Sequence, residues 1–135
     1  MWICTQHGYY STVADKDDPT DDTVWVRARS YDDLVALRDL GYDIGTINGM
    51  RKADYPYRVR MHRSEWSRYV ATEIESIAYP NFKNRVKDRD KTRSHVYMDV
   101  WYAMTAIENE DPHRIRVARN NEAERARSAA LEVRA

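Results

Sequence analysis

Cysteine and glycine are scarce in this sequence, and each scarcity argues against a class of protein. The 135 residues include one cysteine, Cys4, and four glycines. A single cysteine cannot form an internal disulfide, whereas small secreted domains usually carry an even set. The glycines, at positions 8, 41, 45 and 49, match neither of the phosphate-loop patterns GxGxxG and GxxxxGKS/T. The sequence therefore favours a reducing compartment and disfavours a nucleotide-hydrolysing enzyme.

Long apolar runs are also missing. Nowhere do about 18 apolar residues follow one another, as a membrane-spanning helix would need. The first residues do not combine a basic segment with an apolar run, which is the pattern of a secretory signal. We therefore expect a cytoplasmic protein with no membrane partner.

Neither charge is in excess. Lysine plus arginine and aspartate plus glutamate number 22 each, so no overall field attracts nucleic acid. The charges are nevertheless grouped. Five aspartates lie between Asp15 and Asp22 with only Lys16 in opposition. A second group, predicted as a basic loop over residues 83–93, contains Lys83, Arg85, Lys87, Arg89, Lys91 and Arg93. Each group is either a solvated loop or a patch that binds an anion or a partner.

No known catalytic or metal-binding pattern is present. Cys4 and His7 lie close in the sequence, but a metal site needs three or four ligands. The other histidines show neither zinc-finger nor HExxH spacing. Acid–base catalysis by two carboxyl groups needs a dry pocket that makes their pKa values different. Paired acids such as Asp17 and Asp18 fall in an expected loop, where water keeps their environments alike. We predict no enzymatic activity, no cofactor and no metal.

The segment from Tyr57 to Phe82 carries the clearest structural signal. Apolar and basic side chains alternate at its start, which is typical of a strand with one core face and one cationic face. The apolar set is Tyr57, Val59 and Met61, and the opposite set is Arg58, Arg60 and His62. A helix is predicted to follow, with Ser64 as N-cap and Pro80 near its end. Its apolar stripe is Trp66, Tyr69, Val70, Ile74 and Ile77.

The first 56 residues predict two further strand regions and a helix. Residues 2–13 are either a bulged strand or two short strands, and residues 23–29 form a strand that pairs with them across an acidic turn. Ser30 is expected to cap a helix that ends at Gly41. Its inward residues are Leu34, Leu37 and Leu40. The pair Asn48-Gly49 marks a short hairpin or a flexible connection.

Two helices are predicted after the basic loop. The first starts near Ser94, and Asp111-Pro112 starts the second, with the aspartate as cap and the proline at the first helical position. Apolar residues recur at helical spacing in the first, at Tyr97, Val100, Trp101, Met104 and Ile107. The second has only a thin apolar face.

These elements predict an α+β fold. We expect a small antiparallel sheet with helices packed on one face, in a ferredoxin-like, split β-α-β arrangement, plus a C-terminal helical tail. Residues 1–110 form the predicted α+β domain, and residues 111–135 the C-terminal helical extension.

Several segments together resemble a family of small uncharacterised bacterial and phage proteins. They are WICTQHGYYSTV at the start, VRARS before the first helix, DYPYRV, the YPNFK motif (Tyr79 to Lys83) and HVYMDVW. The resemblance covers residues 1–107 and not the tail. It implies a bacterial or phage origin, and it implies no activity, cofactor or catalytic residue.

The candidate binding surface is cationic with aromatic residues between the charges. It consists of Trp25, Arg27, Arg29, Arg58 and Arg60 on the predicted open sheet face, with Lys83 and Arg85 of the basic loop nearby. Such residues are frequent in protein interfaces. On a sheet they also stack bases and hold phosphates. A third interpretation is that the arginines pair with the acidic loop of the same chain.

The predicted function is that of a non-enzymatic interaction protein, a bacterial or phage accessory factor that binds a host or self partner. The partner contacts either the arginine-rich surface or the C-terminal helix, through which a homodimer can form. The alternative is a module that binds nucleic acid or an anionic nucleotide ligand. Zero net charge and the lack of the RNA-binding aromatic pattern disfavour that alternative.

Overall fold

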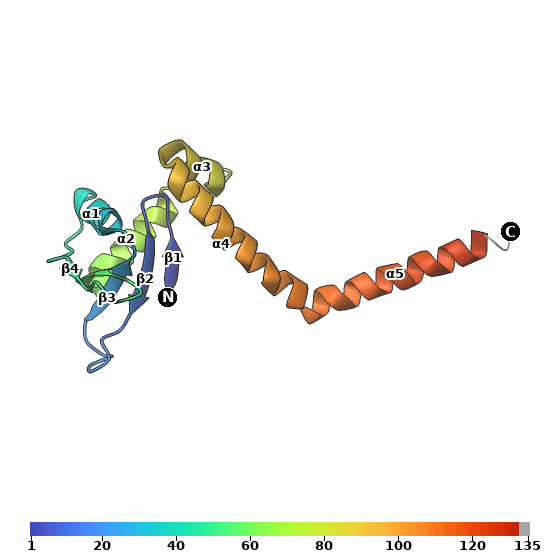
Figure 1. The fold of residues 1–135 in the computed structure, drawn as a ribbon, viewed down its shortest axis with the longest axis horizontal. Coiled ribbons are helices and arrows are strands. Elements are labelled where there is room, and N and C mark those ends of the chain that lie inside the picture. Colours follow the sequence, from blue (N-terminus) through green and yellow to red (C-terminus); the bar gives the residue numbers. More distant parts are fainter. Residues whose placement is uncertain (133–135) are drawn as a thin grey trace. The chain divides into compact units, whose positions relative to one another are not determined.

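Figure 1 shows the fold as a computed structural model in which residues 1–132 are described. The chain divides into two compact units, Met1–Arg89 and a second unit that begins at Asp90. The first contains β1 (Trp2–Cys4), β2 (Tyr9–Val13), β3 (Thr23–Ala28), α1 (Tyr31–Asp39), β4 (Asn48–Gly49), β5 (Tyr57–His62), α2 (Arg63–Glu75) and α3 (Phe82–Arg89). The second contains α4 (Lys91–Glu110) and α5 (Pro112–Glu132). A domain boundary between residues 110 and 111 stays a prediction.

The strands form one antiparallel sheet, which confirms the α+β class. Their order is β1-β2-β3-β5-β4, and every pairing is antiparallel. β3 and β5, which α1 separates in sequence, are direct neighbours. A split β-α-β motif would place another strand between them, so the ferredoxin-like topology is not shown. Residues 2–13 form two short strands, the second of the two predicted alternatives.

The alternation predicted for residues 57–62 is confirmed in β5. Val59 lies opposite Val26 and Met61 opposite Val24, and these four side chains are buried. The residues between them face the other side of the sheet, because successive side chains of a strand alternate. On that side Arg60 lies opposite Trp25, and Arg58 lies opposite Arg27.

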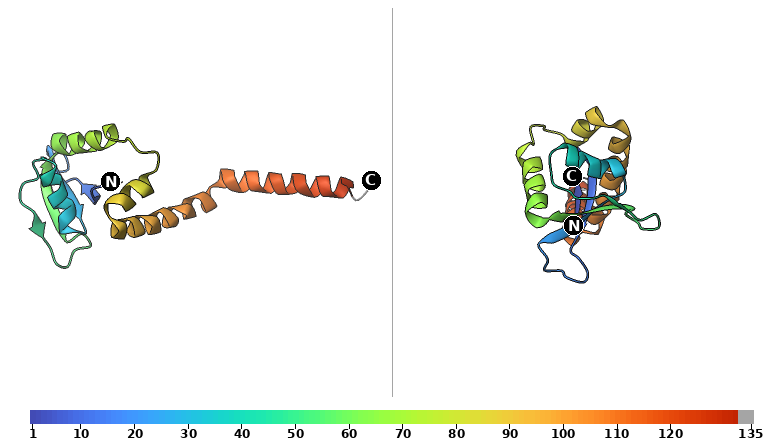
Figure 2. Two further views of the ribbon diagram at one scale, coloured as in Figure 1. Left: turned by 90° about the horizontal axis from the view of Figure 1, so that it is seen from above. Right: turned by 90° about the vertical axis from the view of Figure 1, so that its left-hand side faces the viewer.

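Both α1 and α2 contribute to a single core on the apolar face of the sheet (Figure 2). Leu34 and Leu37 of α1 have no exposed surface, and burying such a side chain stabilises the fold by about 1.5–3 kcal/mol. Trp66 and Tyr69 of α2 stack with ring centroids 5.2 Å apart. Tyr10 of β2 packs edge-on against both rings, which joins the sheet to α2.

The predicted boundaries of α1 are only partly right. Gly41 is the C′ residue, as expected, with φ at 87°. Its N–H donates to the Arg38 carbonyl at 2.9 Å and the Tyr42 N–H to the Leu37 carbonyl at 3.1 Å, which is a Schellman end. Ser30 occupies the N-cap position, but its side chain makes no cap hydrogen bond. The prediction for Leu40 was wrong: it is 45% exposed, because it lies at the cap, beyond the helical turns that face the sheet.

The start of α2 differs from the predicted start. The N-cap is His62, the last residue of β5, and the helix begins at Arg63 rather than after Ser64. The strand continues directly into the helix because the Arg63 N–H donates to the carbonyl of Asp22 at 2.7 Å. Ser64 cannot be the N-cap of α2, because it already lies inside the helix.

The end of the predicted α2 stripe was also wrong. Ile74 and Ile77 are 63% and 55% exposed. The helix ends at Glu75, before Ile77 is reached. Burial in α2 is confined to Trp66 and Tyr69, with Val70 partly buried against the core, so only the first turns of the helix cover the sheet.

The pair Asn48-Gly49 forms neither a hairpin turn nor a flexible connection. It is the edge strand β4, with Asn48 opposite Arg58 and Gly49 opposite Tyr57. The Met50 N–H then donates to the Pro56 carbonyl at 2.7 Å, which closes the connection to β5.

The predicted basic loop over residues 83–93 was wrong, because it is helical. Two short polar caps explain this: the Asn81 side chain accepts from the Asn84 N–H at 3.1 Å, and the Asp90 side chain accepts from the Arg93 N–H at 2.9 Å. These caps start α3 and α4, so α4 begins before Ser94.

The helix start at Asp111-Pro112 is confirmed. α5 begins at Pro112, and the Asp111 carboxylate accepts from the His113 N–H at 2.9 Å. Across residues 1–132, no helix has both the length and the apolar character that crossing a membrane requires.

Candidate binding surfaces

The sheet face opposite the core brings together all five residues predicted there. We call this surface the arginine face, and it consists of Trp25, Arg27, Arg29, Arg58 and Arg60. The four strand residues are placed by the pairing of β3 with β5, while Arg29 directly follows β3. Two arginines directly opposite one another, Arg27 and Arg58, repel each other, so the surface needs compensating groups.

Arg60 is compensated by the acidic loop between β2 and β3. Its Nη2 lies 2.6 Å from Asp21 Oδ2 and 3.6 Å from Asp15 Oδ2, and its Nε donates to Thr23 Oγ1 at 2.7 Å. Its guanidinium carbon also lies 5.5 Å from the ring centroid of Trp25, whose Nε1 donates to Asp15 at 3.1 Å. The third interpretation of the arginines, pairing within the chain, therefore holds for Arg60.

The ring of Tyr55 stabilises the positive charges of Arg27 and Arg29. Both guanidinium carbons lie 4.8 Å from the centroid of the Tyr55 ring, which is a cation–π distance. Tyr55 is 4% exposed, although it lies in the loop before β5. The Arg29 Nη1 donates to the carbonyl of Asp54 at 3.0 Å, and the Arg58 Nη2 to the carbonyl of Tyr55 at 3.3 Å. Sequence reasoning missed Tyr55, because its segment has no periodicity.

Tyr9 of β2 completes this group. Its phenol shares a hydrogen bond with Tyr55, and burial together with that bond raises the pKa of Tyr9 to about 12. Beside it, the Arg27 Nη2 donates to Ser11 Oγ at 2.7 Å. The Nε atoms of Arg27 and Arg58 are buried and have no hydrogen-bond partner in the described part of the chain.

The acidic loop is held in its ionised form by hydrogen bonds. The Asp17 backbone N–H, and then the Trp25 indole and the charge of Arg60, lower the pKa of Asp15. The Thr23 backbone N–H, followed by Arg60, lowers the pKa of Asp21. Because their ionised forms are stabilised, Asp15 and Asp21 are poor general acids. Their negative charges also partly neutralise the positive charge of Arg60.

Lys83 and Arg85 lie on α3, and neither belongs to the strands that carry the arginine face. The Arg85 Nε donates to the Gln6 side chain at 2.7 Å, which ties α3 to the turn between β1 and β2. The position of these two residues in a helix corrects the expectation of a basic loop beside the sheet.

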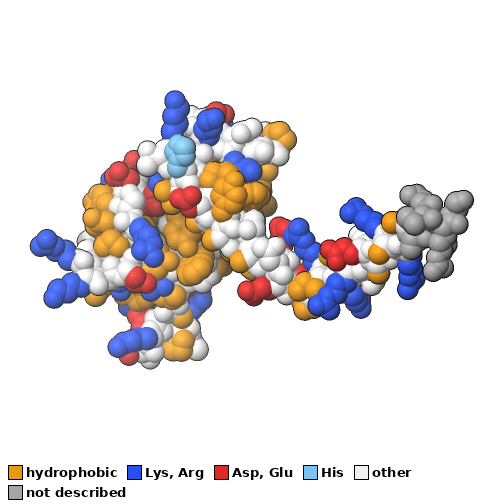
Figure 3. All heavy atoms as spheres, turned by 45° about the vertical axis from the view of Figure 1, so that its right-hand side comes forward, with side chains coloured by type: hydrophobic (Ala, Val, Ile, Leu, Met, Phe, Trp, Pro, Cys, Tyr) orange, Lys and Arg blue, Asp and Glu red, His pale blue; other side chains and the backbone are white. Residues whose placement is uncertain are grey.

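A row of apolar side chains along α4 is exposed. Of the residues in its predicted apolar face, only Tyr97 is buried. The remainder form what we call the α4 stripe, which comprises Val100 (39% exposed), Trp101 (49%), Met104 (55%) and Ile107 (63%). By contrast, charged side chains cover much of α5, the helix that ends at the grey residues in Figure 3. The sequence revealed the periodicity of α4 but not its exposure.

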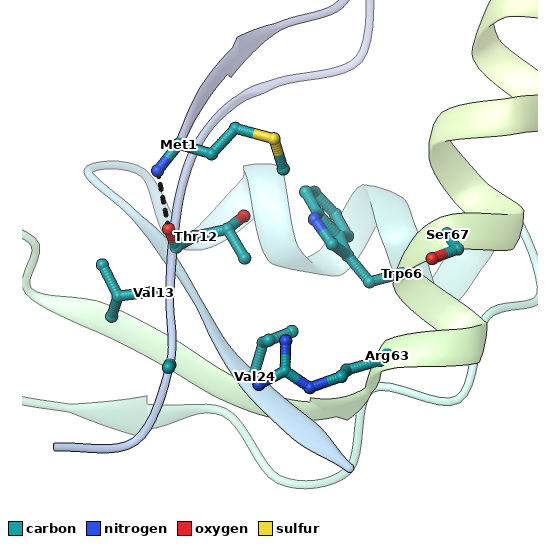
Figure 4. A pocket seen from close by; sticks show the side chains of 8 residues that line it. Met1, Thr12, Val13, Val24, Arg63, Trp66 and Ser67 are labelled. Atoms are coloured by element: carbon teal, nitrogen blue, oxygen red, sulfur yellow. Dashed lines mark hydrogen bonds between the residues drawn. The ribbon is translucent and has the colours of Figure 1, made fainter. Parts of the chain in front are cut away.

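The first unit also has a hollow that sequence reasoning did not find (Figure 4). It measures about 260 Å³ and lies where β2, β3 and the start of α2 meet. Its residues come from widely separated parts of the sequence, so no local pattern identifies it.

His7 is bonded to an acidic side chain of α2. His7 Nδ1 lies 2.7 Å from Glu73 of α2, which makes it a link between the β1–β2 turn and that helix. Partial desolvation raises the pKa of the thiol of Cys4, a residue that is otherwise exposed, and this disfavours the reactive thiolate. Among residues 1–132, no three His, Cys, Asp or Glu side chains are grouped so that they could hold a metal ion.

Comparison with known proteins adds no assignment. No protein-family model, curated protein or solved structure matches the chain significantly.

Proposed function

We propose that the protein is a non-enzymatic interaction factor that binds a protein partner through the α4 stripe. The observation that supports this most directly is the exposure of Trp101, which is 49%, in a row of apolar residues on one helix face. Soluble proteins rarely leave such a row uncovered unless it binds something. Trp and Met are also enriched in protein interfaces.

The charges of α4 favour a second copy of the chain as the partner. The N-terminal end carries Lys91, and the C-terminal end carries Glu110. Two further charged residues at these ends, Arg93 and Glu108, already pair within the chain, with Asp90 and Arg114 respectively. Two α4 helices that pack antiparallel would bring opposite charges together at both ends, with the apolar stripe between them. Such an arrangement is a two-fold interface, the commonest kind in homo-oligomers.

The arginine face is the weaker candidate. Each of its four arginines already donates to a side chain or carbonyl of its own chain, or stacks on an aromatic ring. Binding phosphates there would compete with Asp15 and Asp21 for Arg60. A nucleic-acid or nucleotide-binding function therefore has less support than binding of a protein. The resemblance to small bacterial and phage proteins fits an accessory role of the kind proposed.

The test is the molecular mass in solution of three proteins over a range of concentrations. The wild type should dimerise as concentration rises, and Met104→Glu should remain monomeric because it places a charge within the stripe. The matched control is Ala106→Glu, which introduces the same charge at an exposed position on the opposite side of α4. This control should dimerise like the wild type.

Co-purification extends the test to other partners. If the wild type is monomeric but Met104→Glu removes a protein that co-purifies with it, α4 binds a different protein and the self-partner is wrong. If neither dimerisation nor any co-purifying protein depends on Met104, the proposed function is wrong.

A further inference from the structure

The hollow of the first unit has walls of mixed character. It has a volume of about 260 Å³ and is lined by Met1, Thr12, Val13, Ala14, Val24, Arg63, Trp66 and Ser67. Figure 4 shows the side chains of Thr12 and Trp66 pointing toward each other, the first from β2 and the second from α2. The thioether of Met1 reaches toward Trp66 from the side. The hollow therefore has apolar walls from Met1, Val24 and the Trp66 ring, with polar atoms among them.

Two of these polar atoms are buried without a partner. Trp66 Nε1 and Thr12 Oγ1 make no hydrogen bond to any residue in the part of the chain that the structure describes. The two residues are only 4% and 7% exposed. A buried donor without an acceptor is costly, and native structures contain few of them. An indole N–H can only donate, so whatever satisfies it must supply an acceptor atom.

A positive charge lies at the same hollow. Arg63 is held in place by two backbone carbonyls: its Nε donates to Asp21 at 2.7 Å and its Nη2 to Pro19 at 3.0 Å. Carbonyl groups orient a guanidinium without neutralising its charge. An acceptor that is also an anion would thus satisfy both the buried indole and the arginine.

We propose that this hollow binds a small carboxylic acid with an apolar body. The carboxylate accepts from Trp66 Nε1 and Thr12 Oγ1 and lies in the field of Arg63, while the apolar part contacts Val24 and Met1. A cavity of about 150 Å³ holds a benzene molecule, and drug-sized ligands need roughly 300 Å³ or more. The volume of about 260 Å³ therefore suits a molecule of the size of phenylacetate. This site is separate from the α4 stripe, and the proposal does not depend on the proposed function.

The test follows the indole N–H signal of Trp66 by NMR while phenylacetate is added to the full-length protein. The sequence has four tryptophans, and Trp66→Phe identifies the signal that belongs to Trp66. We expect that signal to move downfield and to saturate at millimolar phenylacetate or below, while the other three indole signals move little.

Three comparisons separate the proposed site from general surface binding. Thr12→Val keeps the shape but removes the hydroxyl, and Arg63→Gln removes the charge. Each should weaken phenylacetate binding about tenfold, since each removes a hydrogen bond or charge contact to an anion. The control Thr72→Val removes an exposed hydroxyl on α2 outside the hollow and should leave the affinity unchanged. Phenylacetamide lacks the charge, so it should bind the wild type more weakly than phenylacetate does. Its affinity for Arg63→Gln should equal its affinity for the wild type.

Two outcomes would overturn the proposal. One is an indole signal that does not respond to phenylacetate, which would mean that only water occupies the hollow. The other is an equal response in the wild type, Thr12→Val and Arg63→Gln, each shown to be folded by its NMR spectrum. That result would place the bound molecule outside the hollow.

Discussion

Arg60 and Asp21 form an ion pair of 2.6 Å that joins β5 to the acidic loop. They lie 39 residues apart in the sequence. The pair therefore holds the loop between β2 and β3 against β5, the strand that carries Arg60. The same guanidinium contacts Trp25 and Asp15. A cluster of aspartates that looks like a solvated turn in the sequence is thus partly a structural contact of the sheet.

The first prediction concerns acid stability. The lowered pKa values of Asp15 and Asp21 mean that the folded state favours their ionised forms. Their contribution to stability is present above the ordinary aspartate pKa of about 3.9 and is lost as the pH falls through the folded values. Asp21→Asn should therefore lower the melting temperature near neutral pH and flatten its dependence on pH below about 4.

Thermal unfolding monitored by circular dichroism between pH 2 and 7 checks this expectation. The control is Asp22→Asn, which removes an exposed carboxylate next to Asp21. If both variants show the pH dependence of the wild type, the ion pair with Arg60 does not contribute to stability.

The second prediction concerns Tyr55. Its ring contacts two guanidinium groups, and its hydroxyl bonds to Tyr9. Tyr55→Leu removes both cation–π contacts and should lower the free energy of unfolding by about 1–3 kcal/mol. Tyr55→Phe keeps the ring and should cost less. Urea unfolding of both variants measures the difference, and equal costs would show that the ring's contact with the arginines is not stabilising.

The third prediction concerns alkaline stability. The pKa of Tyr9 is raised from 10.0 to about 12, so the folded state favours the neutral phenol. That contribution is complete below the unfolded value and is lost as the pH rises from 10.0 toward about 12. The difference in unfolding free energy between wild type and Tyr9→Phe should therefore shift in favour of the variant over this interval. A difference that stays constant would show that Tyr9 titrates alike in the folded and unfolded chain.

Local patterns predicted the parts of the fold that depend on neighbouring residues. The alternation of Val59 and Met61 with Arg58 and Arg60 placed the arginines on one face correctly, because a strand has only two faces. Gly41 marked the end of α1 for a similar reason, since its positive φ favours glycine.

The errors arose where distant segments decide the outcome. The apolar spacing of Ile74 in α2 gave no indication that its side chain is exposed. The many charges between residues 83 and 93 led to the prediction of a loop, although Asn81 and Asp90 are ordinary helix N-caps for α3 and α4. Tyr55 and the hollow both depend on contacts between segments that lie far apart in the sequence, and no periodicity records such contacts.

The last prediction concerns Gly8, in the turn between β1 and β2. A Cβ atom at this position would lie 2.5 Å from Cζ of Tyr10 and closer still to its hydroxyl oxygen. The Tyr10 ring cannot move aside easily, because it has no exposed surface and its hydroxyl donates to the Asp33 carbonyl at 2.9 Å. Gly8→Ala should therefore destabilise the fold by about 1–3 kcal/mol, which is typical of overpacking in a core.

Gly49→Ala is the matched control for this substitution. Nothing lies within 4 Å of a Cβ built at Gly49 and its φ is not positive, so the methyl group meets neither a neighbour nor backbone strain there. Urea unfolding should show a clear loss for Gly8→Ala and little change for Gly49→Ala. In a Tyr10→Leu background Gly8→Ala should cost less than in the wild type, because leucine lacks Cζ and the hydroxyl oxygen, the two atoms that the new methyl group meets most closely. If Gly8→Ala costs the same in both backgrounds, the steric explanation is wrong and the loss arises in the backbone of the turn.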